Sequence, residues 1–234
     1  MNWLRQLFRR KVELTAEQQL ALAAYRSHPR VGNDTPLNTL RFVVADVETT
    51  GLNPFSDRLI SIGAVELLSG RINLGSGFEV VFRQSQASNN ANILVHGIDG
   101  TTQLAGLEPA AATLQFLDYS GNAPLVGFHA DFDRLMIDRA AREAVGLAPS
   151  NHWLDLAYLA PAVMPRPDRK VPVGFDEWME SLGITNIARH NALSDALATA
   201  QLLQVVLARA HEQGVVTLGG LLRLEQDQRW LRTH

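Results

Sequence analysis

The sequence predicts an α/β domain in which a mixed β-sheet is flanked by helices. Three apolar segments joined by short connections come first, over residues 41–48, 58–67 and 77–82, and they predict neighbouring antiparallel strands. Two shorter apolar segments, over residues 123–128 and 153–155, then alternate with helical patterns. The predicted sheet therefore contains three antiparallel strands followed by parallel strands.

Helical patterns fill most of the remaining sequence. Thr15 and Gln18 match the capping box that opens a helix, and His28-Pro29 is expected to end that helix. Ser69-Gly70 and Gly75-Ser76-Gly77 are expected to form the turns between the first three strands. Further helices are expected over residues 108–119, 131–145, 175–182, 191–212 and 215–234.

The motifs described below divide the chain into a central domain and two flanking segments. We expect an N-terminal helical extension over residues 1–38, a main domain over 39–213, and a C-terminal helical tail packed on the domain over 214–234. Four apolar side chains near the N-terminus share one helical face: Trp3, Leu4, Leu7 and Phe8. This face is expected to pack on the main domain, and docking to a partner or to a membrane surface is the open alternative.

Composition indicates a globular protein and excludes several classes of site. Of the 234 residues, 46% are hydrophobic and 19% are charged, which argues against a disordered chain. No apolar run approaches the roughly 18 residues that span a bilayer, so no membrane partner is expected. Cysteine is absent, which excludes disulfides and thiolate metal sites and fits a cytoplasmic location. The net charge of −3 neither requires nor excludes a nucleic-acid partner.

Two carboxylates, Asp46 and Glu48, stand at the end of the first predicted strand. Side chains two positions apart on a strand point to the same face, so these acids are expected to project together. Such close like charges need a neutralising partner, and a divalent cation is the usual one. The polar turn that follows, Thr49-Thr50-Gly51, directs backbone amides and hydroxyls toward a ligand.

Two later clusters place further acids beside helix starts. Asp133 falls in the first turn of the helix that follows the strand at 123–128, a frequent place for ligands in α/β sheets, and Asp131 is expected to cap that helix. Asp195 lies within the long helix among alanine and leucine residues, where an unpaired buried carboxylate is costly. His190 precedes the same helix and has a side chain suited to proton transfer.

These three clusters, in this order, resemble the DnaQ-like 3′–5′ exonucleases of the DEDDh subgroup. The pattern is Asp-x-Glu at 46–48, Phe-Asp at 132–133, and His-x-Ala-x-x-Asp-Ala from His190. The resemblance covers about residues 40–212 and is strongest to the family's proofreading epsilon subunits of bacterial replicative polymerase. It implies a ribonuclease H-like fold and two Mg²⁺ or Mn²⁺ ions per site, which hard carboxylate ligands also favour.

The resemblance also implies a role for each of the five residues. Asp46 bridges both ions, Glu48 and Asp195 hold the ion that activates water, and Asp133 supports the second ion. His190 accepts the proton of the attacking water. The expected reaction is hydrolysis of phosphodiester bonds from a 3′ end, with release of nucleoside 5′-monophosphates.

Other positions are expected to contact the substrate. The pocket for the terminal nucleotide is expected to be lined by Thr49, Thr50, Gly51 and Leu52. His96 matches the family's His-Gly-Ile segment, while His129 stands where the family commonly has asparagine. Three basic residues, Arg166, Arg169 and Lys170, are either guides for the phosphate backbone or solvated loop charges.

Several functions remain open within and beyond the enzyme class. The expected substrate is a single-stranded 3′ end, and DNA is favoured over RNA. A proofreading subunit associated with a DNA polymerase, an RNA-trimming exoribonuclease and a non-catalytic module that binds 3′ ends are the alternatives. The complete set of four acids and one histidine favours an active enzyme.

Overall fold

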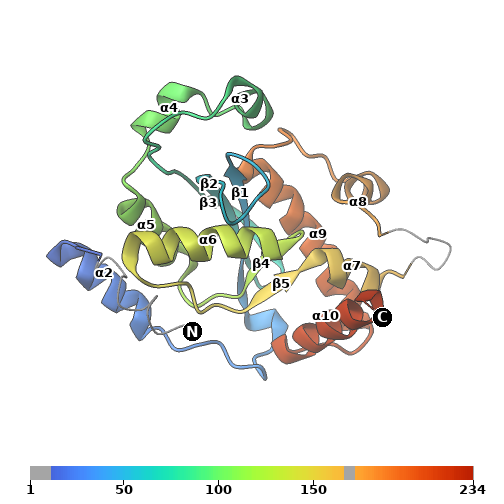
Figure 1. The fold of residues 1–234 in the computed structure, drawn as a ribbon. Helices are drawn as coiled ribbons and strands as arrows, with labels where there is room; N and C mark the ends of the chain where they lie inside the picture. Colours follow the sequence, from blue (N-terminus) through green and yellow to red (C-terminus); the bar gives the residue numbers. More distant parts are fainter. Residues whose placement is uncertain (1–11, 166–171, 234) are drawn as a thin grey trace.

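The computed structural model describes residues 12–165 and 172–233, and the five-stranded sheet at its centre is shown in Figure 1. The strand order is β3-β2-β1-β4-β5. β1, β2 and β3 pair antiparallel, whereas β4 pairs parallel with both β1 and β5, which confirms the predicted mixed sheet. The strands are β1 Arg41–Thr49, β2 Leu59–Leu68, β3 Arg71–Val81, β4 Leu125–Gly127 and β5 Trp153–Asp155.

All the helices expected within the described residues are present, together with short helices over residues 90–96, 100–105 and 156–163 that were not among those expected. The helices are α2 Ala16–Ser27, α3 Asn90–His96, α4 Gly100–Ala105, α5 Pro109–Ser120, α6 Ala130–Val145, α7 Leu156–Val163, α8 Phe175–Leu182, α9 Ala192–Glu212 and α10 Leu218–Thr233. The predicted capping box of α2 forms through Thr15 and Gln18. None of the helices in the described part of the chain is long and apolar enough to cross a membrane.

Alternate side chains of β1 enter two different cores. Phe42 and Val44 pack on the side covered by α7, α8, α9 and α10, while Val43 and Ala45 pack on the side covered by α5 and α6. Because successive strand residues face opposite sides, any polar residue that continues the Phe42-Val44 series points toward α9. This alternation fixes the direction of the acids at the end of β1.

The expected turn at residues 75–77 is wrong, because β3 runs through it. The turn between β2 and β3 is made by Ser69 and Gly70 alone, with φ of 50° and 73°, as a two-residue hairpin loop requires. Between the Glu66–Asn73 and Ala64–Phe78 pairs, the ladder register shifts. The two glycines therefore mark an irregularity within a strand rather than its start.

The flanking helices pack on different parts of the domain (Figure 1). α2 lies against α5 and contributes Leu22 and Tyr25 to a core shared with Leu114 and Leu117. α10 lies against α7. The expected apolar face of residues 3–8 and the basic positions 166, 169 and 170 lie outside the described residues.

Candidate active site

Asp46 and Glu48 lie near the end of β1 and continue the series of Phe42 and Val44 toward α9. Asp46 is paired with Gly63 of β2 in the antiparallel ladder. Glu48 is 9% exposed, so its carboxylate has little contact with water. The strand thus presents two carboxylates at the edge of the core, on the side where α9 begins.

Gly63 permits α9 to approach β2 much more closely than a side chain would allow. A Cβ atom on Gly63 would lie 2.2 Å from the backbone nitrogen of Leu193 and 2.3 Å from the carbonyl carbon of Ala192. Only glycine fits such a contact. The close approach brings the first turns of α9, and with them Asp195, alongside Asp46.

Three carboxylates converge at this contact. Asp46, Glu48 and Asp195 each offer an oxygen atom, and these atoms all lie within 4.8 Å of one another. Asp195 is 4% exposed. The structure therefore brings together three of the four acids that the sequence indicates, from one strand and one helix separated by about 150 residues.

Asp195 has three further polar partners. The Arg189 guanidinium donates from Nη1 to Asp195 Oδ2 at 2.7 Å, and the backbone N–H of His190 donates to the same oxygen at 3.1 Å. The Asn186 side-chain amide donates to Oδ1. His190 adopts a left-handed conformation with φ of 65° and has an exposed side chain. His190, the expected proton acceptor, is thus hydrogen-bonded through its backbone N–H to Asp195, an expected metal ligand.

Asp133 occupies the first turn of α6 and is 5% exposed. It is not part of the group of three, but its charge interacts with that of Asp46. The prediction that Asp131 caps α6 is wrong, because His129 occupies the N-cap position in a left-handed conformation. Asp131 instead pairs with Arg229 of α10 at 2.6 Å.

The pKa values of the acids report the cost of this grouping. Burial raises the pKa of Glu48 to about 9, and the negative charges of Asp46 and Asp195 add to the shift. Burial also raises the pKa of Asp46 and of Asp133 well above the usual range, with neighbouring carboxylates as the next cause. The cluster therefore favours either protons or a bound cation over free negative charge.

The donor set fits a divalent cation of the hard class. Every ligand offered by Asp46, Glu48 and Asp195 is a carboxylate oxygen, the type that Mg²⁺ and Mn²⁺ prefer. A cation among these oxygens would relieve the repulsion between the carboxylates, which adds to the effect of burial on the pKa values of Asp46 and Glu48.

The turn after β1 is held by its own hydrogen bonds. Thr49 Oγ1 donates to the carbonyl of Gly51 at 2.7 Å, and Thr50 Oγ1 donates to Asp57 Oδ1 at 3.1 Å. A Cβ on Gly51 would lie 2.6 Å from the Asp57 carboxylate, so the turn needs glycine there. Leu52 is 88% exposed. Of the four residues expected to line a nucleotide pocket, Leu52 thus offers the free apolar surface.

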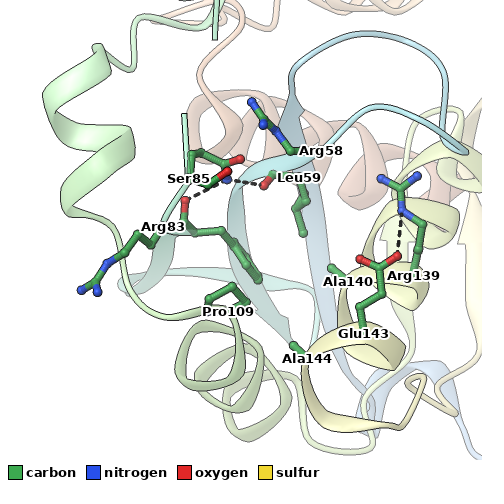
Figure 2. Close-up of a pocket in the computed structure, with 11 residues that line it drawn as sticks. Arg58, Leu59, Arg83, Ser85, Pro109, Arg139, Ala140, Glu143 and Ala144 are labelled. Atoms are coloured by element: carbon green, nitrogen blue, oxygen red, sulfur yellow. Dashed lines mark hydrogen bonds and ion pairs between the residues drawn. The ribbon is translucent and has the colours of Figure 1, made fainter. Parts of the chain in front are cut away.

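A cavity of about 400 Å³ lies beside the β1–β2 turn (Figure 2). Its lining includes the apolar side chains of Leu59, Phe82 and Ala140. Figure 2 shows Arg139 paired with Glu143 at its rim, and Arg139 also donates to two backbone carbonyls of the turn. None of the clustered acids lines this cavity. The cavity is therefore separate from the acid site. Arg139 lines the cavity and is hydrogen-bonded to the turn that follows the strand carrying Asp46 and Glu48.

The His96 side chain is buried and hydrogen-bonded to neighbouring groups of the protein. Its side chain is 3% exposed, Nδ1 accepts the N–H of Ile98 at 3.0 Å, and Nε2 is hydrogen-bonded to Asn92 Oδ1 at 2.9 Å. Asn92 donates in turn to the carbonyl of Thr49 at 3.0 Å. Through Asn92, His96 is linked to the end of β1. The expected contact between His96 and a nucleic-acid strand stays a prediction. Leu94, on the same helix α3, is 85% exposed.

His129 is held by a polar network that reaches the C-terminal helix. Its backbone N–H donates to Asp155 Oδ1 at 2.9 Å, and Arg229 of α10 donates to Asp155 Oδ2 at 3.2 Å. Arg229 also donates to Glu225 at 2.8 Å and lies over the ring of Tyr158. The His129 side chain is therefore exposed, while its backbone is held by a hydrogen bond to the buried carboxylate of Asp155.

Sequence reasoning did not identify four residues that shape the site: Gly63, Asn92, Asn186 and Arg189. Gly63 could have been noticed in the sequence, because a glycine inside a predicted strand often marks a position where another backbone approaches closely. Arg189 adjoins His190, but nothing local indicates that its side chain turns back to Asp195. Asn92 and Asn186 act through contacts that only the folded chain creates.

Comparison with known proteins agrees with this geometry. The family model described as exonuclease (RNase_T) matches residues 43–203, which include all four acids and His190. A DNA polymerase III subunit epsilon-like protein of Rhodobacter capsulatus is 34% identical over 194 residues, covering 81% of this chain and 27% of the relative. A PolC-type DNA polymerase III of Thermotoga petrophila is 26% identical, covering 82% of this chain and 14% of the relative. The chain thus spans less than a third of either relative's length.

Solved structures share the fold. Exonuclease I of E. coli in complex with a dT13 oligonucleotide superposes with a TM-score of 0.62 at 19% identity, covering 75% of this chain and 42% of that one. This likeness agrees with the predicted ribonuclease H-like fold. Because the exonuclease family model matches residues 43–203, more than half of the chain, the chain belongs to the exonuclease family.

Proposed function

We propose that this protein is a metal-dependent 3′–5′ exonuclease that acts on single-stranded DNA and releases nucleoside 5′-monophosphates. The observation that carries the proposal is the convergence of Asp46, Glu48 and Asp195, whose ligand atoms lie within 4.8 Å of one another in a chain of the exonuclease family. Burial and neighbouring carboxylates raise the pKa values of Asp46 and Glu48, so this group of oxygen donors is suited to divalent cations.

In this proposal the four acids hold two Mg²⁺ or Mn²⁺ ions. The charge of Asp46 interacts with those of both Asp195 and Asp133, so Asp46 is suited to be a ligand shared by the two ions. Glu48 and Asp195 complete one ion site, and Asp133 supports the other. Bound ions would polarise the phosphate and lower the pKa of the attacking water.

His190 is the proposed general base. Its exposed side chain extends from a backbone that donates to Asp195, so the imidazole stands at the rim of the acid cluster. From there it accepts the proton of a water molecule that attacks phosphorus, within the usual contribution of a positioned base.

Exposed apolar side chains suit the bases of an unpaired strand. Leu52 is 88% exposed and Phe55 is 82% exposed on the turn after β1, and Leu94 of α3 is 85% exposed. The Asn92–Thr49 hydrogen bond joins α3 to the end of β1, so the two segments that carry these side chains are neighbours. Bases freed from pairing can stack on such surfaces without sequence preference.

The names of the relatives favour DNA and suggest a second candidate role. A replicative polymerase needs an exonuclease that removes misincorporated nucleotides, and the relatives include DNA polymerase III epsilon-like and PolC-type proteins. A proofreading subunit bound to a polymerase is therefore the second candidate, with residues 39–213 as its catalytic domain and 1–38 and 214–234 as helical extensions.

Product analysis on matched DNA and RNA oligonucleotides tests the proposal. With Mg²⁺ or Mn²⁺, we expect a 5′-labelled DNA strand to shorten one nucleotide at a time and nucleoside 5′-monophosphates to accumulate, and EDTA should stop both. Faster trimming of RNA would assign the enzyme to exoribonucleases. Binding to 3′ ends without any shortening would replace the nuclease by a binding module. Co-elution with a polymerase subunit would favour the proofreading role.

A further inference from the structure

Arg189 connects the acid cluster to helix α8. Its guanidinium donates from Nη1 to Asp195 Oδ2 at 2.7 Å and from Nε to Asp176 Oδ1 at 2.9 Å. The same guanidinium lies 5.0 Å from the centre of the Phe175 ring. Asp176 and Phe175 belong to the first turn of α8, so one side chain ties this helix to a carboxylate of the candidate metal site.

The charge of Arg189 acts on the whole acid cluster. Asp195 belongs to the group of three oxygen donors, and it is 4% exposed. The positive charge of Arg189 also opposes the upward pKa shifts of Asp46 and Glu48. A fixed cation therefore already compensates part of the negative charge that a divalent ion would compensate.

Two cations that share one carboxylate compete for it. A divalent ion bound through Asp195 lies within a few ångströms of the guanidinium, and like charges at that separation repel, with partial screening by water because Arg189 is 39% exposed. The Arg189–Asp195 pair stabilises the site without metal and lowers its affinity for metal.

The same oxygen also links Arg189 to the proposed base. Asp195 Oδ2 accepts both the guanidinium of Arg189 and the backbone N–H of His190. Arg189 therefore holds the short segment that carries His190 between α8 and α9. A change at position 189 alters both the charge of the metal site and the placement of the imidazole.

We propose that Arg189 is a positioning residue that serves as the internal counter-ion of the metal site. It keeps Asp195 and the His190 segment in place before metal binds, and it sets a lower metal affinity than the acids alone would give. This inference rests on the proposed metal-dependent function. It concerns a residue that lies outside the set of acids and histidine expected to act on the substrate.

The test compares Arg189→Gln and Arg189→Met with the wild-type protein. Glutamine removes the charge but keeps a donor for Asp195, whereas methionine removes both. Isothermal titration with Mn²⁺ should show that both variants bind the ion more tightly, by roughly threefold to tenfold. In EDTA both should unfold at a lower temperature than the wild type, with the larger loss for methionine. The gain in melting temperature on adding Mn²⁺ should be larger in both variants.

Turnover separates positioning from a substrate contact. In saturating Mn²⁺ both variants should lose kcat because the His190 segment is no longer held, while KM for the DNA strand stays near the wild-type value. Arg209→Met, which breaks an exposed pair with Glu212 on the same helix α9, is the matched control and should change none of these measurements.

Three results would overturn the inference. Equal or weaker Mn²⁺ binding by Arg189→Gln and Arg189→Met would show that Arg189 is not a competing cation. A rise in KM with unchanged Mn²⁺ affinity would assign the side chain to the phosphate backbone of the substrate. If the wild type binds no more Mn²⁺ than an Asp46→Asn variant, the proposed metal site itself fails, which is a different outcome from failure at Arg189 alone.

Discussion

Gly63 of β2 and Leu193 of α9 meet backbone to backbone, so closely that a Cβ on Gly63 would lie 2.2 Å from the Leu193 nitrogen. Gly63 is also the ladder partner of Asp46. This contact therefore sets how near α9, which carries Asp195, comes to the strand that carries Asp46. The spacing of the acid cluster depends on a residue that has no side chain.

We expect Gly63→Ala to separate the two halves of the site. The added methyl group cannot be accommodated against backbone atoms, so α9 must shift, at a cost of about 1–3 kcal/mol in unfolding free energy. Mn²⁺ affinity and turnover should fall together. Gly77→Ala is the matched control, because its Cβ would meet Leu193 Cδ1 at an ordinary 3.6 Å. Wild-type metal affinity in Gly63→Ala would refute this account.

Asp46→Ala should abolish hydrolysis and leave the fold intact. The charge of Asp46 interacts with those of Asp195 and Asp133. Its loss therefore removes the carboxylate proposed to bind both ions. In EDTA, melting temperature should stay the same or rise, because one member of a repelling group is gone. Trimming of a 5′-labelled single strand at the wild-type rate would show that the site is assigned wrongly.

Metal removal should expose a pH dependence of stability to which Glu48 contributes, together with Asp46 and Asp133. Burial raises the pKa of Glu48 from its ordinary 4.5 to about 9, so the folded protein retains a proton that the unfolded chain releases. Stability from this group is therefore greatest at low pH and declines as pH rises between those two values. Thermal unfolding in EDTA should follow this decline.

Two measurements check the assignment to Glu48. Glu48→Gln should make the decline in EDTA less steep, whereas Glu212→Gln, at an exposed position of α9, should leave it unchanged. Saturating Mn²⁺ should flatten the decline in the wild type, because the cation replaces the proton. An identical slope in Glu48→Gln and the wild type would mean that another group is responsible.

His190→Ala should lower turnover by roughly 10²-fold or more and leave metal binding nearly unchanged. The expected split arises because only the backbone N–H of His190 contacts Asp195, and alanine retains that group. Single-turnover rates in saturating Mn²⁺ measure the loss, and titration with Mn²⁺ checks the site. A turnover rate close to that of the wild type would exclude His190 as the base.

Local patterns predicted the elements that position the acids. Strict alternation in β1 places Asp46 and Glu48 on one face, and the capping residue Asn191, which accepts the N–H of Ser194 at 3.0 Å, sets the start of α9. Both signals lie within a few residues of the side chains that they position. Hence the mixed sheet and the start of α9 could be predicted from sequence, whereas the cap of α6 could not.

Contacts between distant segments could not be predicted in the same way. The glycines at 75 and 77 resemble turn residues, but β3 continues through them and they form part of an irregularity in its pairing with β2. His96 looks like an exposed loop residue, yet α3 turns it inward to Asn92. The ladder irregularity depends on pairing with β2, and the surroundings of His96 depend on Asn92, which donates to Thr49 at the end of β1. Periodicity carries no information about either contact.

Arg229→Met should loosen α10 and disturb the start of α6. Asp155 and Glu225, which are 1% and 7% exposed, both accept hydrogen bonds from Arg229, and removing the guanidinium leaves two buried carboxylates side by side. We expect a loss of about 3 kcal/mol in unfolding free energy.

The disturbance should reach α6 because the other oxygen of Asp155 holds the backbone of His129, four residues before Asp133. Hydrogen exchange at the His129 amide should therefore accelerate by more than exchange in α2, which packs on the opposite flank against α5. Arg142→Met, which breaks a partly exposed pair with Asp138 within α6, provides the control. Equal acceleration at His129 and in α2 would indicate general destabilisation instead, and the link from α10 to the acid site would be disproved.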